Sequence, residues 1–375
     1  MTTQLLIAFT LFAVALTLGI VLNAWRDRLR TEVRSVTGSP TGSVSVIIPA
    51  RDAASTIIPL LQDLHAQDLD KERIEVIVVD DQSTDGTDAT VRSMSARWSE
   101  LRVLRSAGIG KKAAITTGVQ AARHSTILLT DADARVGPMR SRMVVAAMEA
   151  QQVDLLILPV RTIGTGALGR LQEEEQAGLT GMAVGAALTG WPSLASGANL
   201  AFRRQAFVDI DGYVGDTYAS GDDVFLVQRM QKAGKRIGGY FHPDVVVTVE
   251  AEGTWQGFLA QRLRWAGKMR GVRGTWPWLG LLVLLLPWAM LWATLRLDLR
   301  DVLATDGVEV LAFMLLAWLL WILPAVNLTT AVRRSFHART WPVVTALCYL
   351  LFTIYSPVIA VAALVHRPRW KGRPT

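Results

Sequence analysis

Apolar residues are concentrated near the two ends of this chain of 375 residues, and that uneven distribution is the strongest constraint on its fold. The stretch 5–25 is almost unbroken apolar sequence, long enough to cross a hydrocarbon layer of about 30 Å. Three further apolar blocks lie at 276–295, 308–330 and 341–365. Between Gly42 and Gly274 no segment is both long and apolar enough to span. This interval is therefore predicted to fold as one water-soluble domain with a substantial core.

Basic residues beside the first apolar stretch predict its orientation. No Lys or Arg precedes it, whereas Arg26, Arg28 and Arg30 follow it directly, with Arg34 close behind. By the positive-inside rule these residues hold its C-terminal end, and the soluble domain after it, in the cytoplasm. The predicted organisation is a transmembrane helix over 1–25, a basic linker over 26–42, a soluble domain over 43–253, an interfacial helix over 254–275, hydrophobic helices over 276–366 and a basic tail over 367–375.

The orientation of the C-terminal segments stays open. The acidic loop 298–309 is predicted to be external and the basic cluster 333–339 internal. Three full crossings would then place the basic tail 367–375 outside, against the positive-inside rule. Either one segment is re-entrant or interfacial, or the tail breaks the trend.

Charge and cysteine content exclude two classes of function. Most of the basic residues behind the net charge of +7 flank the apolar segments, which suits anionic lipid head groups. No basic stripe is apparent in the soluble interval, so nucleic acid is not an expected partner. Cys348 is the single cysteine, which rules out a disulfide within the chain and a thiolate metal cluster.

The soluble interval alternates short apolar runs with helical patterns, which is typical of an α/β fold with a largely parallel, Rossmann-like sheet. The predicted strands are 44–49, 74–80, 101–104, 125–130 and 155–160, and the predicted helices between them are 53–66, 87–98 and 112–123. Ligands of such sheets bind beyond the carboxyl ends of the strands. Four of these strand ends carry polar groups, namely 49–52, 80–81, 108–112 and 131–133. The sequence therefore predicts one polar site along this edge.

Two of these strand ends suit a metal–phosphate group. Asp131 and Asp133 directly follow an apolar strand, and a hard cation such as Mg²⁺ or Mn²⁺ prefers carboxylate oxygens and shares them with substrate phosphates. The loop 108–112 (GIGKK) precedes a predicted helix, whose N-terminus and lysines favour phosphate oxygens. The loop does not match the P-loop pattern, which disfavours an ATPase. Taken singly, each motif is also typical of an ordinary solvated turn.

Two further motifs lie later in the chain. Asp222 and Asp223 begin a helical pattern, where a carboxylate is either a helix cap or a general base for an acceptor hydroxyl. Gln261, Arg264 and Trp265 share one face of a predicted helix close to the membrane, where they would anchor the interface or contact a diphosphate and a sugar. The helical pattern 167–188 is predicted to lie along the bilayer surface, with the acidic triplet 173–175 as a solvated face.

Together these motifs resemble family 2 of the inverting glycosyltransferases, which have the GT-A fold, over roughly 43–270. The resemblance rests on VSVIIPARDAAST, VIVVDDQSTDGT, GIGKKAAITTGVQAA, TDADA, ASGDDVFL and QRLRW, in the family's order. It implies a donor site formed by Pro49, Arg51, Asp80, Asp81, Lys112, Asp131, Gln261, Arg264 and Trp265. It implies a metal held by Asp131 and Asp133, a base at Asp223 beside Asp222, and an acceptor pocket lined by Gly197, Asn199 and Trp265. The family's usual Glu before the base is replaced here by Asp222, after Gly221.

The resemblance also implies a function. The donor is a nucleotide diphosphate sugar, with UDP favoured by the family likeness alone, and the enzyme is an integral protein of a bacterial inner membrane. The acceptor is either a lipid, as for ceramide glucosyltransferases, or a growing polysaccharide, as for hyaluronan and cellulose synthases. Four hydrophobic segments are few for a translocation channel, which favours the lipid. A catalytically silent membrane scaffold is the alternative outside the enzymes, and the sequence predicts no oligomeric state.

Overall fold

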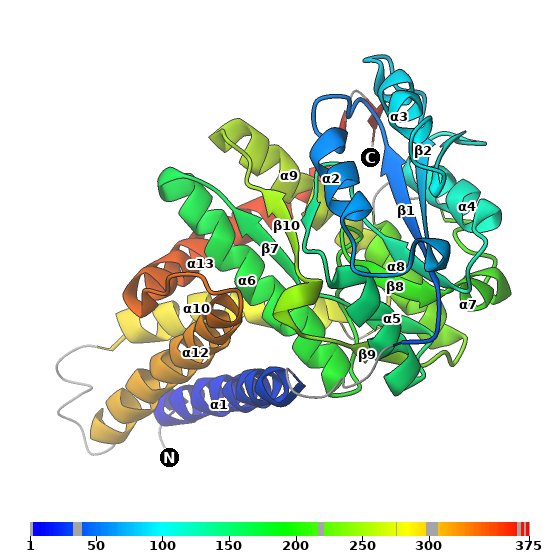
Figure 1. The fold of residues 1–375 in the computed structure, drawn as a ribbon. Coiled ribbons are helices and arrows are strands. Elements are labelled where there is room, and N and C mark those ends of the chain that lie inside the picture. Colours follow the sequence, from blue (N-terminus) through cyan, green and yellow to red (C-terminus); the bar gives the residue numbers. More distant parts are fainter. Residues whose placement is uncertain are drawn as a thin grey trace.

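The computed structural model describes residues 3–32, 40–216, 221–274, 276–297 and 307–365, with two short strands at 369–370 and 373–374. Arg34, the loop residues 298–306 and residues 366–368, 371–372 and 375 lie outside this described part, as do all side chains of the basic tail. In the rest, a mixed α/β domain sits beside a group of long apolar helices (Figure 1).

A seven-stranded sheet forms the centre of the α/β domain, in the order β3-β2-β1-β4-β8-β6-β9. The strands are β1 (Val44–Ala50), β2 (Ile74–Asp80), β3 (Leu101–Arg105), β4 (Thr126–Leu129), β6 (Leu155–Ile157), β8 (Leu200–Arg203) and β9 (Ile237–Gly239). The first four pair in parallel, so their carboxyl ends meet at one edge. Within this sheet β8 runs antiparallel to its neighbours β4 and β6. The predicted α/β class with a parallel-rich sheet is confirmed.

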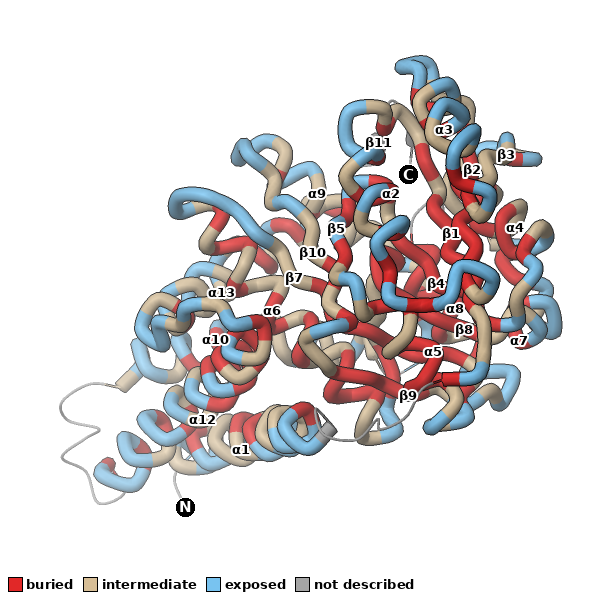
Figure 2. Tube along the Cα trace, viewed as in Figure 1, coloured by how far each residue is buried: buried red, intermediate tan, exposed pale blue. Residues whose placement is uncertain are grey.

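Helices cover both faces of this sheet because its strands are apolar on both sides. In β1, Val46 and Ile48 belong to one core and Ile47 to the other, as the alternation of side chains along a strand requires. Helices α2 (Ile57–His65), α3 (Thr87–Ser95) and α5 (Arg140–Gln151) contribute to the first core. Helices α4 (Lys111–Ala121), α6 (Gly166–Leu188), α7 (Arg204–Asp209) and α8 (Asp222–Lys232) contribute to the second. Both cores are fully buried (Figure 2).

The predicted strand 155–160 is wrong in its extent. It divides into β6, which ends at Ile157, and β7 (Val160–Ile163), which joins β5 (Arg135–Val136) and β10 (Val247–Glu250) in a second sheet. Pro159 lies at the break, where it has no N–H to donate to a ladder. Its carbonyl instead accepts from the Val247 amide at 3.3 Å and from Asn199 Nδ2 at 2.7 Å.

Within the described residues, four helices are long and apolar enough to cross a membrane: α1 (Thr3–Glu32), α10 (Trp276–Leu295), α12 (Gly307–Ser335) and α13 (Pro342–Val365). α1 packs along α12, where the ring of Phe313 meets Phe9 at 5.4 Å and Phe12 at 5.2 Å. α1 continues beyond residue 25, so the basic residues predicted to form a linker extend the helix. The reason is that Leu29, among them, is buried in the second core of the α/β domain.

Helix α13 runs along the α/β domain rather than away from it (Figure 1). Near its start, Thr345 Oγ1 donates to Glu174 Oε2 of α6 at 3.0 Å. In its middle, the Tyr355 ring lies edge-on to Phe258 of α9 (Trp255–Lys268) at 5.6 Å. Its last turns, with Ala363 and Leu364, line the cavity described below.

The acidic triplet of α6 is buried, so its prediction as a solvated face is wrong. Glu174 is 1% exposed and lies 2.6 Å from Arg170 and 3.4 Å from Arg333 of α12. Glu175 accepts bonds from Arg262 of α9 on both carboxylate oxygens, from Nε to Oε1 at 3.0 Å and from Nη2 to Oε2 at 2.6 Å. α6 lies between the α/β domain and α1, α12 and α13. The charges of these acids are compensated by Arg170 of the same helix and by Arg262 and Arg333, which are distant in sequence.

We expect Glu174→Gln to lower the free energy of unfolding by roughly 3 kcal/mol, because it leaves buried arginine charge uncompensated. The loss stays near this value since Glu173 still contacts Arg333 at 3.0 Å. The matched control is Asp88→Asn, which breaks an exposed pair with Arg92 and costs less than about 1 kcal/mol. Thermal unfolding in detergent measures both, and equal midpoints for the two variants would contradict the burial argument.

Candidate active site

A cavity of about 1270 Å³ opens at the carboxyl ends of the parallel strands. The predicted site residues that line it are Pro49, Arg51, Asp81, Asp131, Asp133, Gly197, Asp222, Asp223, Gln261, Arg264 and Trp265. Side chains from distant parts of the sequence thus share one cavity. Three predicted residues do not line it, namely Asp80, Lys112 and Asn199.

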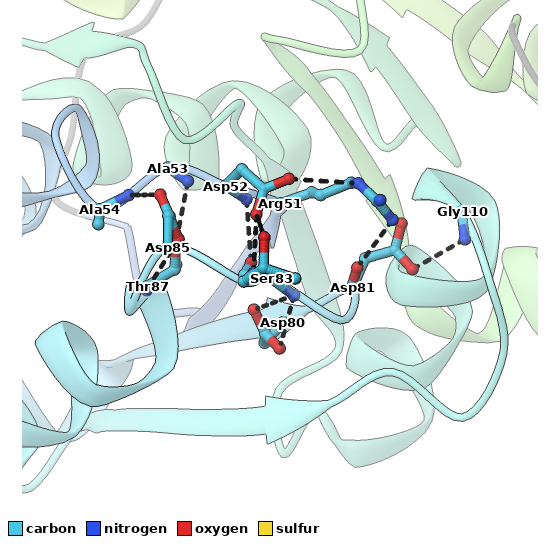
Figure 3. Close-up of polar contacts among 11 residues, drawn as sticks. Arg51, Asp52, Ala53, Ala54, Asp80, Asp81, Ser83, Asp85, Thr87 and Gly110 are labelled. Carbon is cyan, nitrogen blue, oxygen red and sulfur yellow. Dashed lines mark hydrogen bonds and ion pairs between the residues drawn. The ribbon is translucent and has the colours of Figure 1, made fainter. Parts of the chain in front are cut away.

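The first wall of the cavity holds Asp81 at the end of β2 (Figure 3). Its Oδ1 accepts from the Gly110 amide at 2.9 Å, and its carbonyl accepts from Arg51 Nη1 at 3.4 Å. Burial raises the pKa of the Asp81 carboxyl despite the Gly110 bond and Arg51. Asp80 turns away and accepts from the Ser83 amide at 3.3 Å, which closes the turn after β2. Of the two adjacent acids, Asp81 faces the cavity.

The loops after β1 and β2 are joined by reciprocal bonds around Asp52 (Figure 3). The Asp52 amide donates to Ser83 Oγ at 3.0 Å, and Asp52 Oδ1 accepts from the Thr84 amide at 2.8 Å. Asp52 and Gln82 have φ values of 44° and 58°, in the left-handed region. Residues other than glycine adopt this conformation at an energetic cost, and they keep it where the surrounding contacts fix the backbone. These bonds hold the edge of the cavity in one shape.

Lys111 is the cation at the centre of the carboxylates. α4 begins there, directly after Gly110 at φ 97°, and Lys111 Nζ lies 2.8 Å from Asp131 Oδ1 and 3.1 Å from Asp222 Oδ2. Burial alone would lower the pKa of this ammonium, but Asp131 and Asp222 raise it, so the lysine is charged. At Gly197 a Cβ would collide with both the Asp222 carboxylate and the Lys111 ammonium. Glycine is thus required for this close approach.

Lys112, which the resemblance selected, points elsewhere. Its Nζ lies 2.7 Å from Asp216 Oδ2 and 4.8 Å from the centre of the Phe225 ring. Consecutive residues of a helix point about 100° apart, so only one of the two lysines can face the cavity. The motif GIGKK contains both lysines, and only the start of the helix at Lys111 distinguishes them.

Asp222 and Asp223 begin α8 after Gly221, whose φ is 90°. Lys268 Nζ of α9 lies 3.1 Å from both carboxylate oxygens of Asp223, and Asp223 Oδ1 accepts from the Val224 amide at 2.7 Å. Burial opposes ionisation, but Lys268, the Val224 amide and Lys111 outweigh it and lower the pKa of Asp223. Its carboxylate is therefore ionised and faces the cavity.

Helix α9 closes the cavity with Gln261, Arg264 and Trp265, which line it from one face as predicted by their spacing. Arg262 packs against this face. Its guanidinium lies 4.4 Å from the centre of the Trp265 ring, and it also binds Glu175. Neither Arg262 nor Lys268 was singled out from the sequence. Lys268 lies one helical turn beyond Arg264, which is the one sequence signal that could have indicated it.

Asn199 is fully buried and structural in its contacts. Its Oδ1 accepts from Arg140 Nη2 at 2.9 Å, and its Nδ2 donates to the carbonyls of Pro159 and Val245 at 2.7 and 2.8 Å. These bonds use its polar atoms to join the two sheets. It supports the wall of the cavity instead of lining an acceptor pocket.

Asp131 and Asp133 suit a divalent cation whose remaining ligands come from a substrate. Both line the cavity directly after β4. Among the residues that the structure describes, no three His, Cys, Asp or Glu side chains are grouped closely enough to hold a metal by themselves. Mg²⁺ and Mn²⁺ commonly bind one or two carboxylates together with phosphate oxygens and water. The residues present fit that arrangement.

Comparison with known proteins matches part of this chain to a family. Residues 45–211 match the profile of glycosyl transferase family 2. This region is a family 2 glycosyltransferase domain. A probable glycosyltransferase of Bacillus subtilis, YdaM, is 28% identical over 232 residues, which are 60% of this chain and 54% of that protein. An undecaprenyl-phosphate 4-deoxy-4-formamido-L-arabinose transferase of Aeromonas hydrophila is 34% identical over 114 residues, 29% of this chain and 35% of that one. The chain thus spans about half or less of these two relatives.

The fold of the glycosyltransferase domain and its apolar helices has a solved counterpart. The mannosyltransferase PcManGT of Pyrobaculum calidifontis, in complex with GDP-Man and Mn²⁺, superimposes with a TM-score of 0.55 at 21% identity. The match covers 96% of this chain and 98% of that one. This likeness shows the fold, and the predicted GT-A architecture with one N-terminal and three C-terminal helices is confirmed.

We expect Lys111→Gln to lower kcat/KM for sugar transfer by roughly 10²–10³-fold, because the cavity loses a preorganised cation beside Asp131. Lys112→Gln is the matched control, since it removes the neighbouring lysine, which does not line the cavity. Steady-state kinetics on both variants test this assignment. A larger loss for Lys112→Gln than for Lys111→Gln would contradict it.

Proposed function

We propose that this protein transfers a sugar from a nucleotide diphosphate donor to a hydroxyl of a membrane lipid, with inversion at the anomeric carbon. The observation that carries the proposal is the shared cavity, in which Asp131, Asp133 and Lys111 lie with Asp223. Asp131 and Asp133, through a bound cation, and Lys111 can neutralise a leaving diphosphate, while Asp223 can activate an alcohol. The activity places the domain at the cytoplasmic face of a membrane, which for a bacterial protein is the inner membrane.

The donor lies along the strand ends. Asp81 contacts the base or ribose, next to Pro49 and Arg51, and the diphosphate reaches Asp131 and Asp133. A Mg²⁺ or Mn²⁺ held by these two aspartates supplies positive charge to the diphosphate, and the Mn²⁺ bound with GDP-Man in PcManGT supports this choice. Lys111 provides a second positive charge from the protein itself. UDP is our choice of nucleotide, and it rests on the family resemblance.

Asp223 accepts the proton. Its lowered pKa keeps the carboxylate ionised, and Lys268 of α9 holds it in place until the acceptor enters. The acceptor oxygen forms its bond to the anomeric carbon as its proton passes to Asp223 and the bond from that carbon to the diphosphate breaks. The nucleoside diphosphate leaves with the bonding electrons. Lys111 stabilises that charge, to which a cation held by Asp131 and Asp133 would add.

Two observations support a lipid acceptor. The cavity continues from Asp223 to apolar residues of α10 and α13, which are long and apolar enough to lie in a membrane. The Aeromonas relative is named for an undecaprenyl-phosphate substrate. We further propose that α13 lies at the membrane interface. The basic tail after it then stays on the cytoplasmic side, in agreement with the positive-inside rule.

A panel of nucleotide sugars tests the proposal most directly. Purified protein is given each donor with and without extracted membrane lipid, and released nucleoside diphosphate and labelled lipid are measured. We expect one donor to yield labelled lipid, and EDTA to stop the reaction because Asp131 and Asp133 then lose the cation. A high-mass polymer as the product would reject the lipid acceptor, full activity in EDTA would reject the cation, and no turnover with any donor would favour a silent scaffold.

We expect Asp223→Asn to reduce kcat by roughly 10²–10⁴-fold, because the acceptor hydroxyl loses its base. Donor affinity should stay near that of the wild type, since the substitution keeps the volume of the side chain. Donor binding by calorimetry and turnover are measured on the same preparation, with Asp88→Asn as the control for an exposed acid. Turnover at the wild-type rate would remove Asp223 from this role.

A further inference from the structure

The cavity is larger than a donor site needs. Ligand sites for small molecules are typically about 300–1000 Å³, whereas this cavity measures about 1270 Å³. One part is lined by the carboxylates and lysines described above. The other part is lined mainly by apolar side chains of α10 and α13. The cavity therefore extends beyond the carboxylates and lysines into an apolar environment.

The apolar part is built by one face of each of two helices. On α10 the lining residues Pro277, Leu281 and Leu284 recur at helical spacing, and on α13 Phe352 and Ile359 do the same. α10 and α13 are direct neighbours, because Trp288 Nε1 donates to the Thr353 carbonyl at 3.0 Å. The apolar faces of two helices that can cross a membrane ordinarily pack on each other or face lipid. Here they face a cavity that leads to Asp223.

We propose that the hydrocarbon chain of the acceptor lipid occupies this apolar channel between α10 and α13, which joins the bilayer to the catalytic cavity. The inference rests on the proposed lipid acceptor and adds the route by which that lipid enters. A lipid with an apolar chain and a polar head fits a cavity with one polar end and one apolar end. Its head contacts Asp223 and α9, and its chain runs between α10 and α13.

The lateral mouth of the channel is marked by residues that line the cavity and are also exposed. Leu281 of α10 is 43% exposed and Leu364 of α13 is 66% exposed. At the polar end Ile109 is 67% exposed and lines the same cavity. The cavity thus has an apolar mouth at the helices and a separate mouth near the donor loop. Donor and acceptor can therefore enter from different phases.

Two details inside the channel suit a lipid. Gly280 of α10 lines it, and a Cβ at Gly280 would meet nothing within 4 Å, so the wall is open there. Ser356 of α13 is nine-tenths buried, lines the cavity, and its Oγ has no hydrogen-bond partner in the described structure. A buried hydroxyl without a partner is costly. A polar atom near the head of the lipid would satisfy it.

Gly280→Trp plugs the channel, and Leu285→Trp is its matched control. Leu285 lies on the same helix, is 52% exposed and does not line the cavity, so the control adds the same side chain on the outer side. Thermal unfolding of each full-length variant in detergent verifies that it folds. The probe is a long-chain fatty alcohol with a terminal diazirine, incorporated with the protein into phosphatidylcholine and phosphatidylglycerol vesicles.

After illumination, mass spectrometry locates the labelled residues. In the wild type we expect labelling of the cavity-facing Leu284 and Ile359 besides the outward-facing Val358, which is 66% exposed. Gly280→Trp should reduce the labelling of Leu284 and Ile359 by roughly tenfold, because bulk inserted at the wall excludes the chain. Leu285→Trp should leave it unchanged. Labelling confined to outward-facing residues in the wild type, or equal labelling in both variants, would overturn the channel.

The same variants separate the channel from the proposed function. If the donor panel yields labelled lipid but the probe never reaches Leu284 and Ile359, the channel is wrong and the lipid acceptor stands. If the probe labels them and Gly280→Trp prevents it, while the panel yields only polymer, the channel is supported as a lipid site and the acceptor assignment fails.

Discussion

The arrangement of the site depends on one partly buried cation, the ammonium of Lys111 between Asp131 and Asp222. Carboxylates from the end of β4 and the start of α8 would repel each other in a cavity of low dielectric without it. Gly197 lets Lys111 and Asp222 approach, since a side chain there would displace both groups. The pair Lys268–Asp223 extends the same principle to α9. The carboxylates of the cavity are thus held close together by lysines of the same chain.

A second set of charges connects the glycosyltransferase domain to its apolar helices. α6 carries Glu174 and Glu175, which pair with Arg333 of α12 and Arg262 of α9. Buried ion pairs add little net stability, but they permit only one relative placement of the elements that carry them. That placement sets α9 and α13 against the cavity. The apolar helices α10 and α13 are therefore part of the wall of the cavity.

Much of the fold followed from pattern alone. The strands ending at Asp80 and Leu129 were predicted within a residue, because a parallel sheet buried on both sides requires continuous apolar runs. The strand predicted over 155–160 was misplaced because both its halves are apolar, and only Pro159 marks the change of sheet. The acidic triplet of α6 has the sequence pattern of a solvated face because two of its arginine partners, Arg262 and Arg333, lie far away in the sequence.

The sequence by itself determined which residue types stand at the strand ends and where apolar segments begin. It also determined that acidic residues occupy positions 131, 133, 222 and 223. Local patterns can specify these features because they depend on neighbours within a few residues. Only the tertiary structure decided that Lys111 rather than Lys112 faces the carboxylates, that Asn199 supports a wall, and that α10 and α13 extend the cavity. Each of these depends on which direction a side chain points within a packed core, and that direction is set by contacts between segments far apart in the chain.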